Sequence, residues 1–434
     1  MHSILRYILC VAIAVSVLYL PGAAQQSSPA VSDDDDADIR INPEVDYQPS
    51  AADEEKIEIP SFIKEDADTI RMNGADWSVL RHRLAHADSS RVSIVHIGDS
   101  HLQADMATSV VRRRLQSVYG DAGRGLVTPL KMAGTNEPRD YALKGVDGVW
   151  VASKLMKRPW ATRMGFTGVS ATPMSGKGSV EVSTLSRTDT PQLFDRVRLF
   201  HSARPEIEPS VPFVADAIRG DSLVSVVTLP KPVSIVGLDI KLPADEAVYG
   251  MSLERETPGG LLYHVIGNNG AAYSSYNSID GFGSGVALLE PSLIVISLGA
   301  NEAFSRMTAD EMYSSIGVMV RGLQQECPGA QILLTTPMEC QRSTLVRRKG
   351  RRRRVRSYAV NPRVSAMREV ILRYGRDHGI PTYDFYEVAG GAGASAKWIS
   401  DGMMARDRIH NSAKGYSVQG ELLYEALKKA FSAE

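Results

Sequence analysis

The sequence predicts an α/β protein whose parallel sheet is covered by helices on both faces, with an antiparallel β-sandwich inserted into it. Short apolar segments alternate with helix-length segments at about 92–130 and again from about 260 to the end, a rhythm typical of parallel sheets. Residues 136–260 break that rhythm with short alternating pieces rich in Gly, Ser, Thr, Pro and Val, which favour antiparallel strands. The length of 434 residues also exceeds the roughly 100–200 residues of one domain.

The first α/β unit begins with an apolar strand at 92–97, followed by the turn Gly98-Asp99-Ser100 and a helix at 103–118. Later strands are predicted at 261–266, 293–298, 332–336 and 382–386, and later helices at 275–289, 309–326 (with Thr308 as the N-cap), 364–378 and 412–431. Sandwich strands are predicted at 179–183, 196–200 and 233–240. Two tryptophans of the insert, Trp150 and Trp160, are either sugar-stacking platforms or residues of the core and the domain seam, and we favour the second interpretation.

Residues 1–24 have the features of a secretory signal peptide. Arg6 precedes an apolar run at 7–20, and small residues follow it up to Ala24. The run is shorter than the roughly 20 residues that a membrane span needs, and no second run of 18 apolar residues follows. We therefore predict cleavage after Ala24, export to the periplasm or surface of a bacterium, and no transmembrane segment in the mature chain. An uncleaved N-terminal anchor is the alternative.

The formal net charge of −1 conceals two regions of opposite charge. Residues 33–68 hold 14 acidic and 3 basic residues, whereas the rest of the chain beyond the signal has 45 basic and 36 acidic residues. We interpret residues 25–75 as an acidic, disordered linker. The overall balance argues against a dedicated nucleic-acid-binding protein, so no nucleic acid partner is expected.

A basic run at 347–356 contains eight basic residues. It follows the strand that ends at Pro337, at the carboxyl side of the predicted sheet. Three interpretations stay open, namely a solvated loop, a site of proteolytic processing, and an electrostatic funnel for an anionic polymer.

The cysteines predict neither a disulfide nor a metal site. Removal of the signal leaves Cys327 and Cys340, which flank a predicted strand at 331–337. Such a strand spans roughly 23 Å, whereas the Cα atoms of a disulfide lie about 5–6 Å apart. No Cys/His cluster has ligand spacing, so structural zinc is not expected, and no cofactor is predicted.

Two motifs far apart in the chain together suggest a nucleophile and its base. Ser100 follows a strand and precedes a helix, where ligand sites of open α/β sheets form. A serine hydroxyl needs a base to accept its proton and a carboxylate to orient that base. Asp407 and His410 lie three residues apart ahead of the last helix, so one loop can supply both groups.

Two further motifs can donate hydrogen bonds to an oxyanion. Asn301 follows the strand at 293–298, and an amide donor of this kind contributes roughly 3–4 kcal/mol in comparable sites. Gly270 follows the strand at 261–266, where the missing Cβ lets a backbone N–H approach closely. Gly267 lies three residues earlier and is the alternative donor.

These four motifs, in this order, resemble the blocks of the SGNH (GDSL-like) hydrolases. The resemblance covers about 92–130 and 262–434 and implies a three-layer α/β/α fold and ester hydrolysis through an acyl-enzyme. It implies Ser100 as nucleophile, His410 as base and Asp407 as its orienting group. It also implies Gly270, Asn301 and the N–H of Ser100 as oxyanion donors. The second block of the family often has a Gly-x-x-Gly-Asp turn, whereas in this chain Ala271 follows Gly270.

A narrower likeness links the chain to bacterial peptidoglycan O-acetylesterases. These proteins have His after the serine, Asn-Glu in the third block and a β-sandwich inserted after the first block, and all three features occur here. The resemblance implies an exported serine esterase that removes O-acetyl groups from a cell-envelope polysaccharide, with peptidoglycan as the expected substrate.

Three other functions are alternatives to this one. His96, Asp99 and His101 near Asn301-Glu302 suggest a two-metal phosphoesterase, but the Asp-x-His and Asn-His-Glu/Asp elements of that chemistry are missing. We interpret His96 as a strand residue bonded to backbone and His101 as a residue behind the site. A carbohydrate-binding or envelope-assembly protein on a hydrolase scaffold is a second alternative. A lipase or thioesterase of the same fold is a third, although the sequence shows no long apolar lid.

Overall fold

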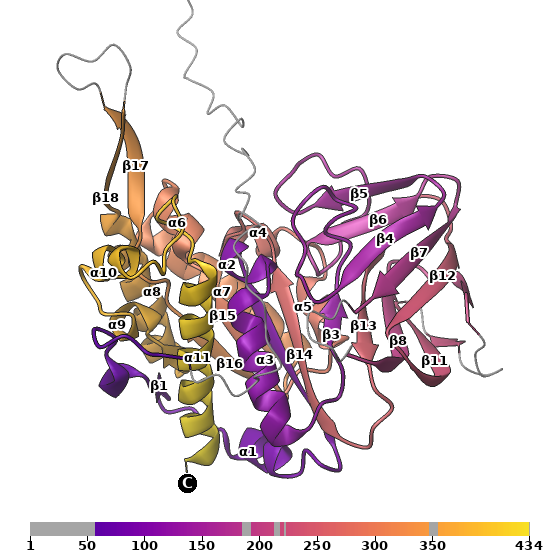
Figure 1. The fold of residues 1–434 in the computed structure, drawn as a ribbon, viewed down its shortest axis with the longest axis horizontal. Coiled ribbons are helices and arrows are strands. Elements are labelled where there is room, and N and C mark those ends of the chain that lie inside the picture. Colours follow the sequence, from indigo (N-terminus) through magenta and orange to yellow (C-terminus); the bar gives the residue numbers. More distant parts are fainter. Residues whose placement is uncertain (1–56, 185–191, 212–217, 221–222, 347–354, 434) are drawn as a thin grey trace, which may run out of the picture. The chain divides into compact units, whose positions relative to one another are not determined.

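The computed structural model describes residues 57–184, 192–211, 218–220, 223–346 and 355–433 (Figure 1). The predicted signal at 1–24, the linker up to residue 56 and the first eight residues of the basic run, 347–354, lie outside this part. All described residues belong to one unit that spans Tyr47–Glu434. None of the helices in this part is both long and apolar enough to cross a membrane.

A six-stranded sheet forms the centre of the α/β unit, in the order β1-β19-β16-β15-β2-β14. The strands from β19 to β14 run parallel and β1 runs antiparallel to β19. Their bounds are Ile70–Arg71 for β1, Arg91–Gly98 for β2, Gly260–Gly267 for β14, Leu293–Ser297 for β15, Gln331–Thr335 for β16 and Thr382–Tyr383 for β19. The central strands are buried along nearly their whole length, as expected for a sheet covered on both faces.

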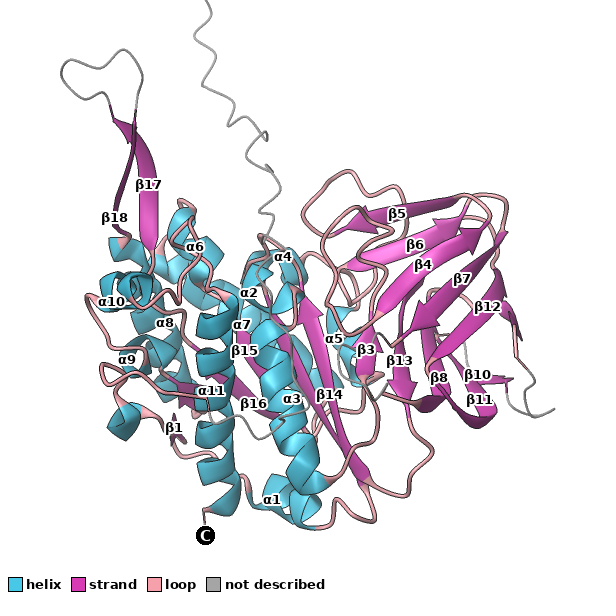
Figure 2. Ribbon diagram, in the orientation of Figure 1, coloured by secondary structure: helices cyan, strands magenta, loops and turns pink. Residues whose placement is uncertain are grey.

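Helices cover both faces of the sheet, which confirms the predicted α/β/α layering (Figure 2). On one face α1 (Ser78–Ala85) and α3 (Met106–Tyr119) pack with α11 (Ala413–Ser432). On the other face α4 (Tyr273–Asn277), α5 (Phe282–Ala287), α7 (Ala309–Glu326) and α8 (Pro362–His378) pack against one another. Short helices α2 (Ser100–Gln103), α6 (Ala300–Phe304), α9 (Phe385–Val388) and α10 (Ala394–Ser400) lie in the connections, and a 3-10 turn occupies Glu65–Ala67.

Thr308 caps α7 as predicted, because its hydroxyl accepts the Glu311 N–H and the Glu311 carboxylate accepts the Thr308 N–H. Two other predicted elements are wrong in part. The helix expected at 275–289 is two short helices, α4 and α5, because Gly281 between them has a left-handed backbone with φ of 68°. The strand expected at 382–386 stops after two residues, and α9 begins at Phe385.

The predicted linker extends too far. Residues 57–75 are part of the fold, since Ile63 lies in the core and β1 pairs with β19. The carboxyl of Asp68 is buried, accepts the Tyr383 hydroxyl at 2.8 Å and lies 3.6 Å from Lys429. These contacts give the acidic segment a structural role up to the start of α1.

The insert is an antiparallel β-sandwich, as predicted. One sheet has the order β10-β11-β8-β13-β6-β5 with β3 paired to β13, and the other has the order β4-β7-β12-β9. The first sheet comprises β3 (Gly125–Val127), β5 (Trp150–Lys154), β6 (Val169–Pro173), β8 (Phe194–His201), β10 (Ile218–Gly220), β11 (Val224–Val233) and β13 (Val248–Glu254). The second comprises β4 (Ala142–Asp147), β7 (Lys177–Ser183), β9 (Glu206–Pro209) and β12 (Ile235–Lys241). Strand β3 precedes the predicted start at 136, so the sandwich draws its first strand from the α/β side of that boundary.

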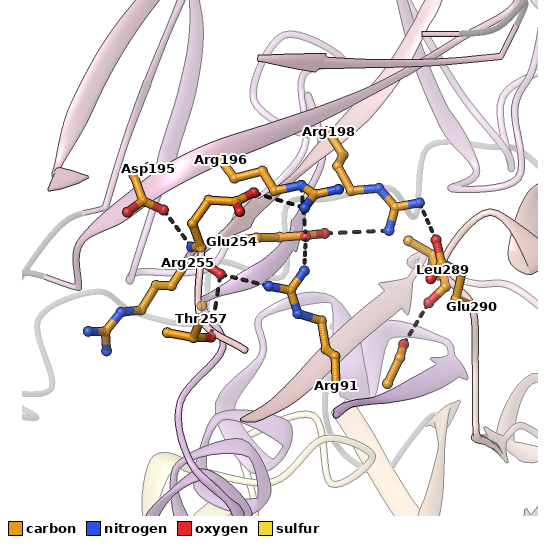
Figure 3. Close-up of polar contacts among 12 residues, drawn as sticks. Arg91, Asp195, Arg196, Arg198, Glu254, Arg255, Thr257, Leu289 and Glu290 are labelled. Atoms are coloured by element: carbon orange, nitrogen blue, oxygen red, sulfur yellow. Dashed lines mark hydrogen bonds and ion pairs between the residues drawn. The ribbon is translucent and has the colours of Figure 1, made fainter. Parts of the chain in front are cut away.

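An apolar core and a buried ion cluster join the sandwich to the α/β unit. Trp160, Phe166 and Phe200 of the insert belong to the same apolar cluster as the parallel sheet, whereas Trp150 packs in the separate core of the sandwich. The buried Glu254 lies 2.8 Å from Arg91, 3.7 Å from Arg196 and 3.6 Å from Arg198 (Figure 3). Arg91 begins β2 whereas the other three residues lie in the insert, so this carboxylate joins the two parts.

A hairpin that was not predicted follows β16. Strands β17 (Gln341–Val346) and β18 (Val355–Val360) pair antiparallel and are largely exposed. The two strands extend away from the layered α/β unit (Figure 1). The described end of the basic run, Val355 and Arg356, therefore belongs to a β-ribbon.

Candidate active site

The register of the parallel sheet brings the predicted motifs to one edge. Gly98 at the end of β2 is level with Gly267 of β14 on one side and with Ser297 of β15 on the other. The segments that follow these three strands carry Ser100, Gly270 and Asn301. Carboxyl ends of parallel strands are where open α/β sheets bind ligands, so the site lies where the fold class predicts.

A tight strand-to-helix turn presents Ser100. A Cβ on Gly98 would lie 2.9 Å from the Ser297 carbonyl oxygen and 2.7 Å from Leu102, so this position requires glycine. The Asp99 carboxylate accepts the His101 N–H at 2.9 Å and caps α2, whose first residue is Ser100. The Ser100 N–H has no acceptor among the described residues, which leaves this donor free for a ligand.

Ser100, His410 and Asp407 form one chain of hydrogen bonds. The Ser100 Oγ lies 2.7 Å from His410 Nε2, and His410 Nδ1 lies 2.7 Å from Asp407 Oδ2. Because ionised Asp407 can only accept, Nδ1 carries the proton of the neutral ring and Nε2 accepts the serine hydroxyl. Ser100 and His410 are 310 positions apart in the sequence, and the structure brings them together with Asp407.

The loop before α11 holds Asp407 in this orientation. Its Oδ1 accepts the N–H groups of Ile409 and His410 at 2.9 and 3.0 Å, while Oδ2 faces the imidazole. Burial raises the pKa of Asp407, but the hydrogen bond and charge of His410 and the two N–H groups outweigh it. Its pKa therefore lies below the ordinary value, and the carboxylate is ionised at neutral pH.

Asn301 lies between the segments that carry Ser100 and Gly270. Its Nδ2 donates to Asp99 Oδ2 at 3.1 Å and to the Ala271 carbonyl at 2.9 Å. Both amide hydrogens are thus engaged, and an oxyanion must displace one of these acceptors to be bound by Asn301. The Asp99 bond is the longer one, and burial raises the pKa of Asp99 to about 6.

The structure distinguishes the two candidate glycines. Gly267 packs against α2, since a Cβ there would lie 2.5 Å from the Gln103 nitrogen. Gly270 has a left-handed φ of 78°, and the only heavy atoms near the position of its absent Cβ belong to Met156 of the insert, at 3.7 and 3.9 Å. Its N–H has no acceptor among the described residues. The geometry therefore favours Gly270 over Gly267 as a donor to a ligand.

Two residues that the sequence did not single out as functional position the turn at 268–273. The amide of the buried Gln103 accepts the Asn269 N–H at 2.7 Å and donates to Asn136 Oδ1 at 2.7 Å. The buried Glu302 accepts the Tyr273 N–H at 2.8 Å, next to Asn301, which holds the Ala271 carbonyl. Burial raises the pKa of Glu302 to about 7. Only the adjacency of Glu302 to Asn301 in the sequence signalled such a role.

The other histidines near the site are neutral, and of the two His96 is buried while His101 is half-buried. His96 does not bond to backbone as expected; it contacts the Tyr263 hydroxyl at 2.8 Å and the Ser297 hydroxyl at 2.6 Å. The ring of His101 lies 4.9 Å from that of His410, and its Nδ1 lies 3.2 Å from the Tyr416 hydroxyl. Burial lowers the pKa of both His96 and His101 to about 3, so neither carries charge at neutral pH.

A pocket lies below the strand ends, next to the serine turn. Asp99 and Ile409 are in its wall, but Ser100 and His410 are not. Ser297, Thr335 and Cys340 contribute further lining. Among the described residues, no group of three or more His, Cys, Asp and Glu side chains is arranged to hold a metal ion. Cys327 and Cys340 are both free and buried.

Comparisons with known proteins agree with this fold. The sequence model of the GDSL-like Lipase/Acylhydrolase family matches residues 220–418, which include Gly270, Asn301, Asp407 and His410. A solved peptidoglycan O-acetylesterase is 22% identical with a TM-score of 0.68, and the match covers 83% of this chain and 99% of that one. At this identity the likeness shows the fold, including the inserted sandwich.

Other solved structures match smaller parts. The lipase/acylhydrolase from Enterococcus faecalis is 21% identical with a TM-score of 0.29, covering 39% of this chain and 77% of its own. An acetyl xylan esterase is 14% identical with a TM-score of 0.30, covering 38% of this chain and 81% of its own. A comparison with curated proteins gives no significant match. The likeness to the GDSL-like lipase/acylhydrolase (SGNH hydrolase) family thus rests on a sequence match to the second part of the chain and on a shared fold.

Proposed function

We propose that the protein is an exported serine esterase that removes O-acetyl groups from a cell-envelope polysaccharide, with peptidoglycan as substrate. The observation that carries the proposal is the hydrogen-bonded chain from Ser100 through His410 to Asp407. An aligned hydroxyl, imidazole and carboxylate is the arrangement that acyl transfer through a serine requires.

In the first half of the proposed reaction, Ser100 Oγ attacks the acetyl carbonyl while His410 Nε2 accepts its proton. The imidazolium that forms is stabilised by Asp407, which already accepts from Nδ1 at 2.7 Å. The tetrahedral intermediate collapses, His410 returns the proton to the departing sugar oxygen, and Ser100 stays acetylated. Water then attacks with His410 as base, and acetate is released as Ser100 recovers its proton.

The oxyanion of the intermediate needs donors that are not already engaged. The N–H groups of Ser100 and Gly270 meet this condition among the described residues. Asn301 is the proposed third donor, and it joins when its amide turns from Asp99 toward the developing charge. Such donors contribute most when they are held in place before the reaction, and the anchors at Gln103 and Glu302 supply that support.

Substrate and location rest on separate observations. The solved structure that this chain matches over 99% of that structure's length is a peptidoglycan O-acetylesterase. Residues 1–24 have the composition of a signal peptide. An exported esterase of this fold meets an acetylated envelope polymer directly. Acetyl is a small acyl group, and Met156 of the insert lies close to Gly270, where it would limit the space beside the reacting carbonyl.

The proposal is tested by hydrolysis of p-nitrophenyl acetate by the wild type and by Ser100→Ala. We expect turnover by the wild type and a loss of at least about a thousandfold in the variant. Release of acetate from O-acetylated peptidoglycan is then compared with release from acetylated xylan. Equal inactivity of both proteins on all three substrates would exclude the esterase and favour a binding role.

A further inference from the structure

We propose that the β17–β18 hairpin and the arginines at its base form a docking surface for a carboxylate-bearing glycan strand, which they hold beside Ser100 and His410. The inference rests on the proposed function, because it assigns the part of the protein that recognises the envelope polymer. It concerns four exposed arginines in the described part of the chain, Arg306, Arg342, Arg356 and Arg406.

The hairpin is attached to the two segments that carry the candidate site. On one side, the Gln341 N–H donates to the Arg408 carbonyl at 2.9 Å, and the Arg408 guanidinium donates to Gln341 Oε1 at 2.9 Å. Arg408 lies between Asp407 and His410 and has a left-handed φ of 62°. A strained non-glycine backbone persists only where its surroundings hold it, and here the hairpin supplies that support.

Tyr358 of β18 extends the same attachment. Its ring lies 4.0 Å below the Arg408 guanidinium, and its hydroxyl donates to the Arg406 carbonyl at 3.3 Å. On the other side of the hairpin, Arg342 donates to the Phe304 carbonyl at 3.3 Å at the end of α6, the helix that carries Asn301. The base of the hairpin therefore stands between the His410 loop and the Asn301 helix.

The arginines around this base lack the carboxylate partners that several other described arginines have. Arg91, Arg112, Arg124 and Arg368 each pair with a carboxylate. In contrast, Arg306, Arg342, Arg356 and Arg406 form no ion pair with any carboxylate of the described residues, and all four side chains are exposed. Their positive charge is uncompensated, so this surface attracts an anionic partner.

The form of the surface fits a polymer better than a small anion. Each strand of the hairpin has six residues, which corresponds to about 20 Å of extended chain. Arg342 and Arg356 point to opposite faces, because they occupy alternate positions of the paired strands. Exposed arginines on both sides of a ribbon, with further ones at its base, can contact carboxylates spaced along one strand. The carboxylates on the peptide stems along a peptidoglycan glycan strand have this character.

The test separates docking from chemistry. A variant with Arg306→Gln, Arg342→Gln, Arg356→Gln and Arg406→Gln keeps residues 347–354 intact. The matched control replaces four exposed arginines without ion pairs elsewhere, Arg113→Gln, Arg204→Gln, Arg321→Gln and Arg376→Gln. Both sets are combined with Ser100→Ala, and binding to O-acetylated peptidoglycan is measured by co-sedimentation at about 50 mM salt, where exposed charges act at long range.

We expect the hairpin variant to bind about tenfold more weakly, since each of four exposed charges contributes only modestly to binding. The control variant should bind like its parent. The parent should also bind more weakly to peptidoglycan whose carboxyls have been amidated. Equal binding by the hairpin variant, or undiminished binding of the parent to the amidated polymer, would overturn the proposal. Preference for a phosphate-rich wall polymer over peptidoglycan would overturn it too.

A kinetic measurement connects the surface to turnover. In the Ser100 background, kcat/KM for O-acetylated peptidoglycan divided by kcat/KM for p-nitrophenyl acetate should fall about tenfold in the hairpin variant. An unchanged ratio contradicts docking, whereas absence of p-nitrophenyl acetate hydrolysis by the wild type contradicts the esterase. The two failures are thereby distinguished, because binding by the Ser100→Ala proteins is measured without any turnover.

Discussion

Replacement of Asp407 by Asn should reduce turnover far more than its small change in shape suggests. Asp407 has two accepting oxygens, of which Oδ1 takes two backbone N–H groups and Oδ2 takes His410 Nδ1–H. An asparagine has only one accepting oxygen. The two N–H groups retain it, so the NH₂ group faces Nδ1 and forces the proton of the ring onto Nε2. In that tautomer His410 cannot accept the proton of Ser100.

Loss of the correct tautomer in a triad costs about 10³–10⁴ in kcat, which corresponds to roughly 4–5.5 kcal/mol at 1.36 kcal/mol per decade. The assay is kcat for p-nitrophenyl acetate, with melting temperature measured on the same samples. Asp401→Asn is the matched control, because that exposed residue also lies in the segment before α11 and its carboxylate has no ion pair among the described residues. If Asp407→Asn kept more than about a tenth of wild-type kcat, the assigned tautomer and the role of Asp407 would both be wrong.

Three other predictions concern stability and thiols. Burial raises the pKa of Asp68 and Asp99 to about 6 and the pKa of Glu302 to about 7. At a pH between the unfolded and folded pKa values, the folded chain holds protons that the unfolded chain has released. The free energy of unfolding should therefore fall as pH rises from 4.5 through 7. Thermal melting at several pH values should show a shallower decline in Glu302→Gln, and an identical decline would contradict the raised pKa. Glu254→Ala should destabilise the protein by about 3–5 kcal/mol, because it leaves Arg91, Arg196 and Arg198 around an empty buried site (Figure 3). As a control, Glu256→Ala removes a partly exposed partner of Arg196 and should cost less than about 1 kcal/mol in denaturant titrations. Similar losses of stability in both variants would refute a special role of Glu254 in joining the sandwich to the α/β unit. Cys327 and Cys340 are buried, and burial raises their pKa to about 11 and about 12. A chain without the leader should therefore show two titratable thiols only after denaturation. Rapid labelling of these thiols in the native chain would contradict this prediction.

The periodicity of the sequence was sufficient to predict most of the α/β unit. Strand β2 and helix α7 lie within one residue of their expected bounds, because long, strongly patterned segments bury the same face in any context. The break at Gly281 and the short β19 were missed, because tertiary packing determines where a short apolar segment turns. The hairpin was missed for a related reason, as its strands are exposed and carry no buried apolar stripe.

For the candidate site, local motifs identified which residue types were present, and the structure determined how they meet. Local motifs and their resemblance to the ordered SGNH blocks suggested Ser100, Gly270, Asn301, Asp407 and His410. The hydrogen bonds of Gln103 to Asn269 and of Glu302 to Tyr273 were not predictable, because they join segments separated by 166 and 29 positions without any motif of their own.

The sequence by itself determined the fold class, the insertion of a sandwich and the chemical groups at the strand ends, since hydrophobic period and turn residues act locally. Only the tertiary structure decided that Ser100 contacts His410, that Gly267 packs against α2 while Gly270 is open, and that a basic hairpin stands between the His410 loop and the Asn301 helix. These relations depend on the register of parallel strands and on contacts between distant segments. A linear pattern of residues encodes neither of them directly.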